Sequence, residues 1–186
     1  MNGADAYRLW VRASDKAFTL AVRGAFGAFG ARSTIQRPVR LRGEGNIEIG
    51  SQVFVGAGSW LQTMPVDGCA APRLVIGDRT TFTGHCVVVA AQEVRFGRAV
   101  LLARNVYVSD HHHHYRGHDQ PILAQGLDGI APVLIDDGAW LGQNVVICAG
   151  VTVGKGAVVA ANSVVKADVP DRCMAAGAPA RIVKSY

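Results

Sequence analysis

Residues 131–170 read APVLIDDGAWLGQNVVICAGVTVGKGAVVAANSVVKADVP, and their spacing decides the fold. Aliphatic residues recur at every sixth position, and turn-forming glycines lie between them. The residues two positions before each aliphatic one are small or β-branched. A period of six fits neither an α-helix nor a simple strand alternation, and it is typical of a β-solenoid. The aliphatic positions are Ile135, Leu141, Ile147, Val153, Val159 and Val165.

One hexapeptide is too short to bury its own aliphatic side chain. Three of them must therefore form the sides of a triangular coil of about 18 residues that stacks on its neighbours. Further blocks with this spacing occur at residues 49–61, 76–94 and 96–108. Together they predict an all-β fold, a parallel β-helix of about five coils, which at about 4.8 Å per strand is about 24 Å long. The spacing leaves the hand of the coil open, although parallel crossovers are usually right-handed.

The N-terminal region differs from the rest in charge and in periodicity. Residues 1–42 contain eight Lys or Arg and two Asp, a net charge of +6, whereas the whole chain carries +5. Residues 4–29 predict an amphipathic helix with Arg8, Arg12 and Lys16 on its polar side. We expect this helix to cap the open end of the solenoid, with docking to an anionic membrane surface or an acidic partner as the alternative. The apolar positions that share a face are Tyr7, Val11, Phe18, Val22, Phe26 and Phe29.

The pattern divides the chain into three parts. Residues 1–43 form the N-terminal basic helix and linker, residues 44–170 form the β-helix with a protruding loop at 109–132, and residues 171–186 form a C-terminal tail. No apolar run reaches the roughly 20 residues that span a membrane, and the N-terminus lacks the features of a secretory signal. We therefore expect a cytoplasmic protein, at most peripheral to the inner face of the membrane, with reduced cysteines and no nucleic-acid partner.

Five of the six histidines lie in one interruption of the repeat, SDHHHHYRGHDQPI at residues 109–122. Residues 108 and 135 are 27 positions apart. The repeat needs about 18 there, so about nine residues must leave the coil as a loop. Loops raised from a rigid scaffold commonly carry binding and catalytic groups. We therefore expect the histidine cluster to be displayed on the surface.

The repeats, the looped SDHHHHY at 109–115 and the tail AAGAPARIVK at 175–184 resemble the hexapeptide-repeat O-acetyltransferases, which include galactoside and maltose acetyltransferases. The motif D-H-x-H-x-Y, followed by PI and QG, is most similar to the enzymes that acetylate sugars of capsule, colanic acid or O-antigen. The resemblance implies a left-handed β-helix that assembles as a homotrimer, with active sites between neighbouring prisms. It also implies acetyl-coenzyme A as donor and a sugar hydroxyl of a surface-polysaccharide precursor as acceptor.

The resemblance also implies roles for residues in and near the loop. The acting histidine of the family falls on His111, beside Asp110, and the second histidine of the motif falls on His113. Asn105 and Tyr115 are the expected contacts of the saccharide. A sugar hydroxyl is a poor nucleophile, and a neutral imidazole can accept its proton as it attacks the thioester, which is worth roughly 10² to 10⁴ in rate. His112 and His114 are expected to have no catalytic role.

Coenzyme A needs an apolar groove with backbone hydrogen-bonding groups and a cationic rim, and the family places this groove along the last coils. Two positions depart from the family pattern. Lys166 lies one position earlier than the usual lysine, and Arg116 and Gly117 stand where an acidic residue often follows the loop motif. The residues carried over as coenzyme contacts are Trp140, Gly142, Ala160, Ser163, Lys166 and Arg181.

Two other classes of protein fit parts of the pattern. The γ-carbonic anhydrases are also β-helical trimers, and they hold zinc with three histidines, for which His85, His113 and His118 are candidates. A non-catalytic β-helical scaffold would need no histidine cluster. The long loop and its motif favour the acetyltransferase, for which we expect no metal.

Overall fold

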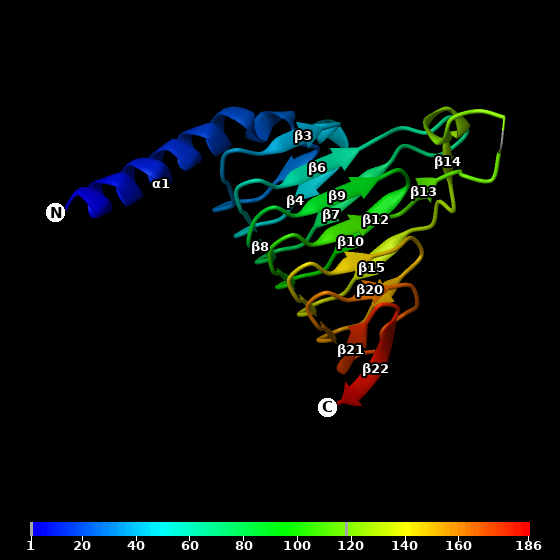
Figure 1. The fold of residues 1–186 in the computed structure, drawn as a ribbon. Coiled ribbons are helices and arrows are strands. Elements are labelled where there is room, and N and C mark those ends of the chain that lie inside the picture. The colour runs from blue at the N-terminus through cyan, green and yellow to red at the C-terminus, as the bar shows by residue number, and fades with distance from the viewer. Residues whose placement is uncertain (1, 118) are drawn as a thin grey trace.

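The computed structural model describes residues 2–117 and 119–186, in which three parallel sheets wrap around one core (Figure 1). Each turn of the chain adds one strand to each sheet in the same order, as expected for a solenoid. Sheet A consists of β1 (Ala28–Phe29), β4 (Ile47–Ile49), β7 (Arg73–Ile76), β10 (Glu93–Phe96), β15 (Val133–Ile135) and β18 (Thr152–Val153).

Sheets B and C follow the same order. Sheet B ends in an antiparallel hairpin of its last two strands. Its strands are β2 (Thr34–Ile35), β5 (Phe54–Val55), β8 (Thr81–Phe82), β11 (Leu101–Leu102), β16 (Trp140–Leu141), β19 (Val158–Val159), β21 (Cys173–Gly177) and β22 (Ala180–Ser185). Sheet C consists of β3 (Arg40–Arg42), β6 (Trp60–Thr63), β9 (Val87–Ala90), β12 (Tyr107–Ser109), β17 (Val146–Ile147) and β20 (Val164–Val165).

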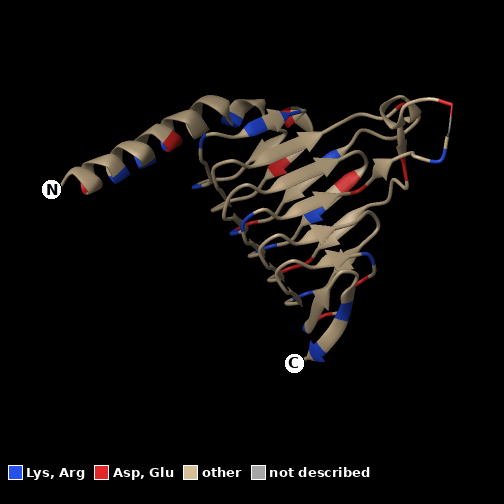
Figure 2. Ribbon diagram, in the orientation of Figure 1, with Lys and Arg blue, Asp and Glu red and all other residues tan. Residues whose placement is uncertain are grey.

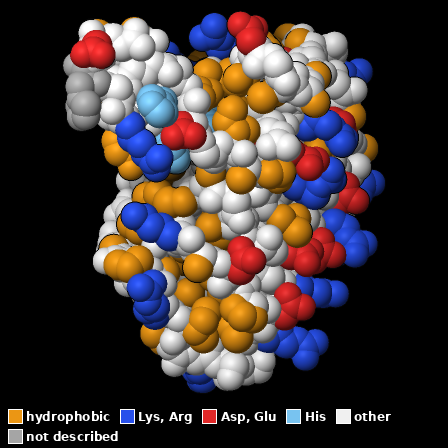
Figure 3. All heavy atoms as spheres, turned by 90° about the vertical axis from the view of Figure 1, so that its right-hand side faces the viewer, with side chains coloured by type: hydrophobic (Ala, Val, Ile, Leu, Met, Phe, Trp, Pro, Cys, Tyr) orange, Lys and Arg blue, Asp and Glu red, His pale blue; other side chains and the backbone are white. Residues whose placement is uncertain are grey.

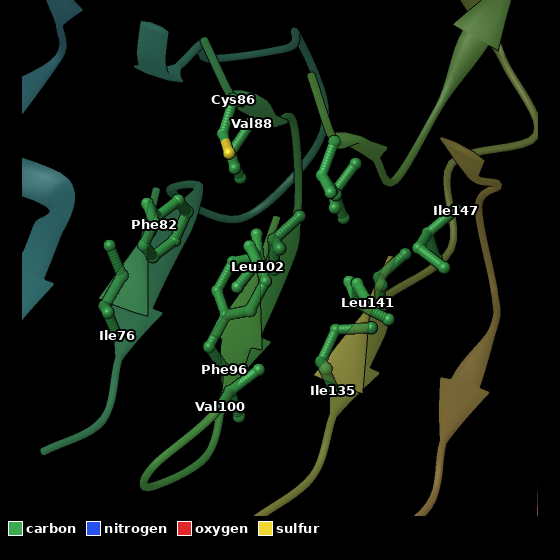
Figure 4. Packing of buried hydrophobic residues seen from close by; sticks show 14 of the residues in the cluster. Ile76, Phe82, Cys86, Val88, Phe96, Val100, Leu102, Ile135, Leu141 and Ile147 are labelled. Atoms are coloured by element: carbon green, nitrogen blue, oxygen red, sulfur yellow. The ribbon is translucent and has the colours of Figure 1, made fainter. Parts of the chain in front are cut away.

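The aliphatic position of each hexapeptide points into the core, as the spacing predicts. Figure 4 shows Ile135, Leu141 and Ile147 directed inward from one coil, and all three are fully buried. In the neighbouring coils Phe82 and Phe96 fill the same space, with ring centroids 5.2 Å apart in an edge-to-face arrangement. Burying a side chain of this size contributes about 1.5–3 kcal/mol, so the stacked core is the main source of stability.

The corner between sheets B and C holds a column of residues in the left-handed backbone conformation. Asn105, Asn144 and Asn162 have φ values of 59°, 59° and 61° there. Asparagine adopts this conformation more readily than most residues. The side chain of Asn105 donates to Asn144, and that of Asn144 donates to Asn162, at 3.2 and 2.9 Å. The stacked amides therefore connect three successive coils.

The N-terminal helix is shorter than the sequence pattern predicts. α1 (Gly3–Val22) begins with a capping box between Asn2 and Asp5 and continues into a 3₁₀ turn, η1 (Arg23–Ala25). Residues 28–42, which the sequence analysis assigned to the helix end and the linker, instead form β1, β2 and β3. A second 3₁₀ turn, η2 (Glu44–Asn46), precedes β4. The three sheets therefore begin before residue 44.

The C-terminal half of α1 lies against the first coil. Thr19 accepts the backbone N–H of Ile35 at 2.9 Å, and Asp15 accepts that of Arg37 at 3.2 Å, so the helix satisfies groups at the open edge of sheet B. The N-terminal half projects beyond the prism (Figure 1). No helix within the described residues is long and apolar enough to cross a membrane.

Candidate active site

The histidine loop leaves the prism after β12 and returns as a short hairpin. β13 (His112–His113) pairs antiparallel with β14 (Leu127–Asp128), and the 3₁₀ turn η3 (Ile122–Gln125) lies between them. The backbone N–H of His114 donates to the carbonyl of Gly126 at 3.0 Å. At the base of the loop, Ala131 donates to the carbonyl of Asp110 at 2.9 Å. These bonds tie the loop to the scaffold at the corner between sheets C and A.

Asp110 occupies the point where the loop leaves the scaffold, and its side chain is fully buried. Its carboxylate accepts the backbone N–H of Ala91 at 2.8 Å and that of Gln92 at 2.7 Å. Both donors belong to the preceding coil, which stacks beside β12. The carboxylate is therefore fixed by the fold and not by the loop.

The same carboxylate contacts the imidazole of His111, with 2.8 Å between Oδ1 and Nδ1. Ser109 Oγ lies 3.3 Å from the same nitrogen and donates to the backbone carbonyl of His111 at 2.9 Å. Because an ionised carboxylate only accepts hydrogen bonds, Nδ1 must carry the proton of the neutral ring. Nε2 is then left with a free lone pair, which is what a general base requires.

The surroundings favour the ionised form of Asp110. Burial alone would raise the pKa of this carboxyl, but the hydrogen bond with His111 and those from Ala91 and Gln92 outweigh burial, and the pKa falls below its usual value. A buried negative charge stabilises a neighbouring imidazolium. The carboxylate of Asp110 would therefore stabilise the ring of His111 once that ring has accepted a proton.

The other described histidines of the cluster differ from His111 in exposure and partners. The side chain of His111 is 9% exposed, whereas His112 and His113 lie exposed on β13. His114 pairs with Asp128 at 3.3 Å, and both side chains are 38% exposed. The pKa of Asp128 is lowered, mainly by the hydrogen bond from the backbone N–H of Gly129 and next by the hydrogen bond with His114. The fifth histidine of the loop, His118, lies outside the described residues.

A pocket of about 280 Å³ lies beneath the loop, over the outer face of sheet C. Figure 3 shows this side of the molecule, with histidine side chains near the loop and hydrophobic side chains gathered below them. The pocket is open to solvent. It is lined by Tyr107, Ser109, His111, His112, His113, Val146, Ile147, Cys148 and Ala149.

The expected saccharide contacts lie at different ends of β12. Tyr115 is exposed on the loop, with the guanidinium of Arg116 5.9 Å from its ring centroid. Asn105 lies in the asparagine column at the corner between sheets B and C, whereas His111 follows the opposite end of the strand. Six residues of fully extended chain span at most about 20 Å, so the two residues stand at opposite ends of the strand within one chain.

The expected coenzyme contacts also divide between two parts of the surface. Trp140 is exposed on the outer face of sheet B, and Gly142 and Ala160 follow its strands. Lys166 follows β20 in sheet C, and Arg181 is exposed on β22. Trp140 on sheet B and Lys166 at the end of a strand of sheet C therefore lie on different faces of the prism.

Three of these residues have structural roles in the stack. A Cβ atom on Gly142 would lie 2.6 Å from the backbone nitrogen of Ala161, so only glycine fits where these coils approach each other. The N–H of Ala160 already donates to Ala175. Ser163 is fully buried and its hydroxyl accepts the N–H of Gly177 at 3.1 Å.

The zinc alternative finds no support in the part of the chain that the structure describes. No group of three His, Cys, Asp or Glu among these residues could hold a metal ion. His85 lies at the corner between sheets B and C, in the coil before Asn105, and His113 lies beyond the other end of β12. These two candidate ligands therefore lie at opposite ends of the strands of sheet C.

Several pocket residues were not selected from the sequence, among them Ser109 and Cys148. Ser109 belongs to the loop motif at residues 109–115. It stands two positions before His111 in the sequence, and this proximity is the signal from which their contact could have been predicted. Cys148 lines the pocket because β17 stacks on β12, which places it beside Ser109. The hexapeptide spacing alone would predict which residues of β12 and β17 pair. The loop at 109–132 separates these two strands in the sequence and hides that pairing.

Comparison with known proteins identifies the family. The model of the bacterial transferase hexapeptide (six repeats) matches residues 132–167. A hexapeptide-repeat acetyltransferase of Vibrio cholerae O1 biovar eltor, solved with acetyl-coenzyme A, is 30% identical, and the alignment covers 92% of this chain and 78% of that one with a TM-score of 0.59. The chain therefore belongs to the hexapeptide-repeat acetyltransferases and is an acyltransferase.

Two curated relatives from Escherichia coli (strain K12) are similar over most of the chain. WbbJ, named as a lipopolysaccharide biosynthesis O-acetyl transferase, is 29% identical over 82% of this chain and 78% of its own length. The galactoside O-acetyltransferase is 31% identical over 70% of this chain and 62% of its own length. The N-acyltransferase AntD of Bacillus cereus shares the fold, with a TM-score of 0.75 at 18% identity over 87% of this chain and 84% of that one.

Proposed function

We propose that this protein is an acetyl-coenzyme A-dependent O-acetyltransferase that acetylates a sugar hydroxyl of a surface-polysaccharide precursor or related saccharide. The observation that carries the proposal is the Asp110–His111 pair. A fully buried carboxylate lies 2.8 Å from Nδ1 of an imidazole that lines an open pocket. This geometry supports His111 as a general base, and the family to which the chain belongs transfers acetyl groups.

In the proposed reaction, Nε2 of His111 accepts the proton of the sugar hydroxyl as its oxygen attacks the thioester carbonyl. The tetrahedral intermediate then collapses, the carbon–sulfur bond breaks, and His111 returns the proton to the departing thiolate. Asp110 holds the ring in the required tautomer and stabilises the imidazolium between the two steps. General base catalysis of this kind contributes roughly 10² to 10⁴ in rate.

The relatives support the choice of donor and acceptor. The Vibrio cholerae acetyltransferase was solved with acetyl-coenzyme A. Both Escherichia coli relatives are named for O-acetyl transfer, one in lipopolysaccharide biosynthesis and one to galactosides. We propose the same donor and a saccharide acceptor here, with His113 and Tyr115 as acceptor contacts on the loop. The proposed compartment is the cytoplasm, where acetyl-coenzyme A is available.

We propose that three left-handed β-helical prisms assemble as a homotrimer, and the outer faces of the sheets support this. The outer face of sheet A carries a ladder of ion pairs, in which Arg73 lies 2.8 Å from Glu48 and Arg95 lies 2.6 Å from Glu93. The outer faces of the other two sheets are mostly apolar, which is typical of surfaces that become buried. They present Phe54, Leu101, Trp140 and Val158 on sheet B, and Trp60, Val87, Tyr107, Val146 and Val164 on sheet C.

Such an assembly would also complete the coenzyme site. If sheet B of one copy faces sheet C of the next, Trp140 of one chain approaches the pocket that holds His111 of the other. The two parts of the surface that one chain separates would then line one groove. We propose that Lys166 and Arg181 contribute to its cationic rim.

The test is release of free thiol from acetyl-coenzyme A in the presence of candidate acceptors, namely galactosides, nucleotide sugars and lipid-linked oligosaccharides. We expect acceptor-dependent release that His111→Ala removes, and a light-scattering mass three times the 19.6 kDa of the chain. If no saccharide stimulates thiol release although acetyl-coenzyme A binds, the proposed acceptor class is wrong. A monomer at micromolar concentration would contradict the shared site.

A further inference from the structure

The helix α1 has an exposed apolar strip on the side that faces away from the prism. Its packed side includes Phe18 and Val22, and the half-buried Val11 has the same helical phase. Residues two positions away lie about 200° around a helix. Leu9 and Leu20 are two positions from packed residues, so they point outward, and both are more than half exposed. Alanines with the same helical phase complete the strip, which consists of Ala6, Leu9, Ala13, Ala17 and Leu20.

Cationic and aromatic side chains flank this strip. Tyr7 and Trp10 lie on one side, stacked with 6.3 Å between ring centroids, and Trp10 is 66% exposed. The basic residues on the other side are Arg8, Arg12, Lys16 and Arg23. In Figure 2 the positions of Lys and Arg residues follow one another along the ribbon of α1. An apolar strip between aromatic and basic residues is the arrangement of helices that lie in a membrane interface.

A hollow of about 610 Å³ beside the helix extends the basic flank onto the first coil. It is lined by Lys16 and Arg23 of α1 and by Arg32 of the turn between β1 and β2. None of the described residues that line it is acidic. Leu20 also lines the hollow, so the cationic surface adjoins the apolar strip. Three cations around one hollow form a site for the phosphate of a lipid headgroup.

We propose that α1 and this hollow dock the protein onto an anionic lipid surface. The strip would enter the boundary between headgroups and acyl chains, and Lys16, Arg23 and Arg32 would lie against the phosphates. The charge favours lipid over a second copy of the chain, because a second copy carries the same basic residues, whereas an anionic surface carries the opposite charge. Figure 1 shows α1 at the N-terminal end of the prism, so the docked protein stands on that end. The surface does not depend on the acetyl transfer proposed above.

The expected binding depends on charge and on salt. Each Lys or Arg held near an anionic membrane strengthens binding by about fivefold. The attraction is screened beyond about 8 Å at physiological ionic strength, so binding weakens as salt rises. Removing the charges of Lys16 and Arg23 therefore weakens binding about 25-fold. Reversing them weakens it further.

The experiment is sedimentation of the full chain with vesicles of phosphatidylcholine alone or with added phosphatidylglycerol, at low and at physiological ionic strength. We expect binding to the anionic vesicles that falls with salt and is lost in Lys16→Glu/Arg23→Glu. A matched control, Lys155→Glu/Lys184→Glu, makes the same change in net charge with exposed residues elsewhere on the prism. We expect it to bind like the unchanged protein.

A second variant, Leu9→Glu/Leu20→Glu, tests the strip at two exposed positions where folding is unaffected, which circular dichroism verifies. We expect it to lose lipid binding while its light-scattering mass stays unchanged. The proposal is overturned if the unchanged protein ignores anionic vesicles at low salt, or if both charge variants bind equally. A smaller mass of the leucine variant with full lipid binding would assign the strip to contacts between copies.

Discussion

Replacing Asp110 by Asn exchanges one oxygen of the buried carboxylate for an NH₂ group. The amide keeps the shape of the carboxyl, and its oxygen can still accept the N–H groups of Ala91 and Gln92. Its NH₂ group must then face Nδ1 of His111, 2.8 Å away. Because that group donates, Nδ1 becomes the acceptor and the ring proton moves to Nε2. The imidazole can then no longer accept the proton of the sugar.

The expected loss is therefore close to that of removing the base, roughly 10² to 10⁴ in kcat. Binding of acetyl-coenzyme A should not change, since Asp110 lies beneath the pocket and does not line it. Stability should fall by about 1–3 kcal/mol, because hydrogen bonds to an ionised acceptor are stronger than those to an amide. Activity thus falls much further than the loss of folded protein can explain.

The assay is thiol release with a saturating acceptor, together with thermal unfolding of the same samples. Asp128→Asn is the matched control, because Asp128 also pairs with a histidine, His114, but both side chains are 38% exposed. We expect this control to keep its activity. The tautomer argument is refuted if folded Asp110→Asn retains the unchanged rate, or if the two variants lose the same amount.

The same variant should alter the dependence of stability on pH. The pKa of Asp110 is lowered in the folded state, so its ionised form stabilises the fold above the unfolded value of about 3.9. That contribution is lost as the pH falls through the folded pKa. Urea unfolding of Asp110→Asn should therefore show a shallower decline on the acidic side. Parallel declines in both proteins would mean that Asp110 contributes no such stability.

Two further predictions concern the loop and the coils. His111→Ala should lower kcat roughly 10² to 10⁴ with little change in coenzyme affinity, His112→Ala and His114→Ala should cost far less, and His113→Ala should lie between them, all measured by thiol release. A folded, active His111→Ala would move the base to His113. Gly142→Ala should destabilise the fold by about 1–3 kcal/mol in urea unfolding, because its Cβ would meet the backbone of the next coil, and an unchanged midpoint would contradict this close approach.

The repeat could be predicted from the sequence because the core imposes it directly. Each coil has room for one large side chain per sheet, so the buried positions recur at a fixed interval. The start of the solenoid was missed although its residues show the same interval. Phe29, Ile35 and Leu41 are six apart, but Phe29 also fits the apolar face of the preceding helix. Val22, Phe26 and Phe29 are spaced four and three residues apart, so the helical pattern competes with the hexapeptide pattern at this point.

The candidate base could also be selected from the sequence, but its environment could not. The family pattern predicts an acidic residue after the loop motif, where Arg116 and Gly117 stand. The carboxylate that contacts the imidazole of His111 is instead that of Asp110, which precedes the histidine. Its fixed position depends on Ala91 and Gln92, which lie 19 and 18 residues earlier and reach it only because the coils stack.

The distribution of the remaining residues follows from the same stacking. A prism places every residue of one hexapeptide position in a column, so residues of different positions stay on different faces however many coils are added. The proposed base, His111, stands at the corner between sheets C and A, and the exposed Trp140 stands on sheet B. No change within one prism can bring them together. An active site that needs both must lie between prisms, and the two apolar faces are the surfaces on which that contact can form.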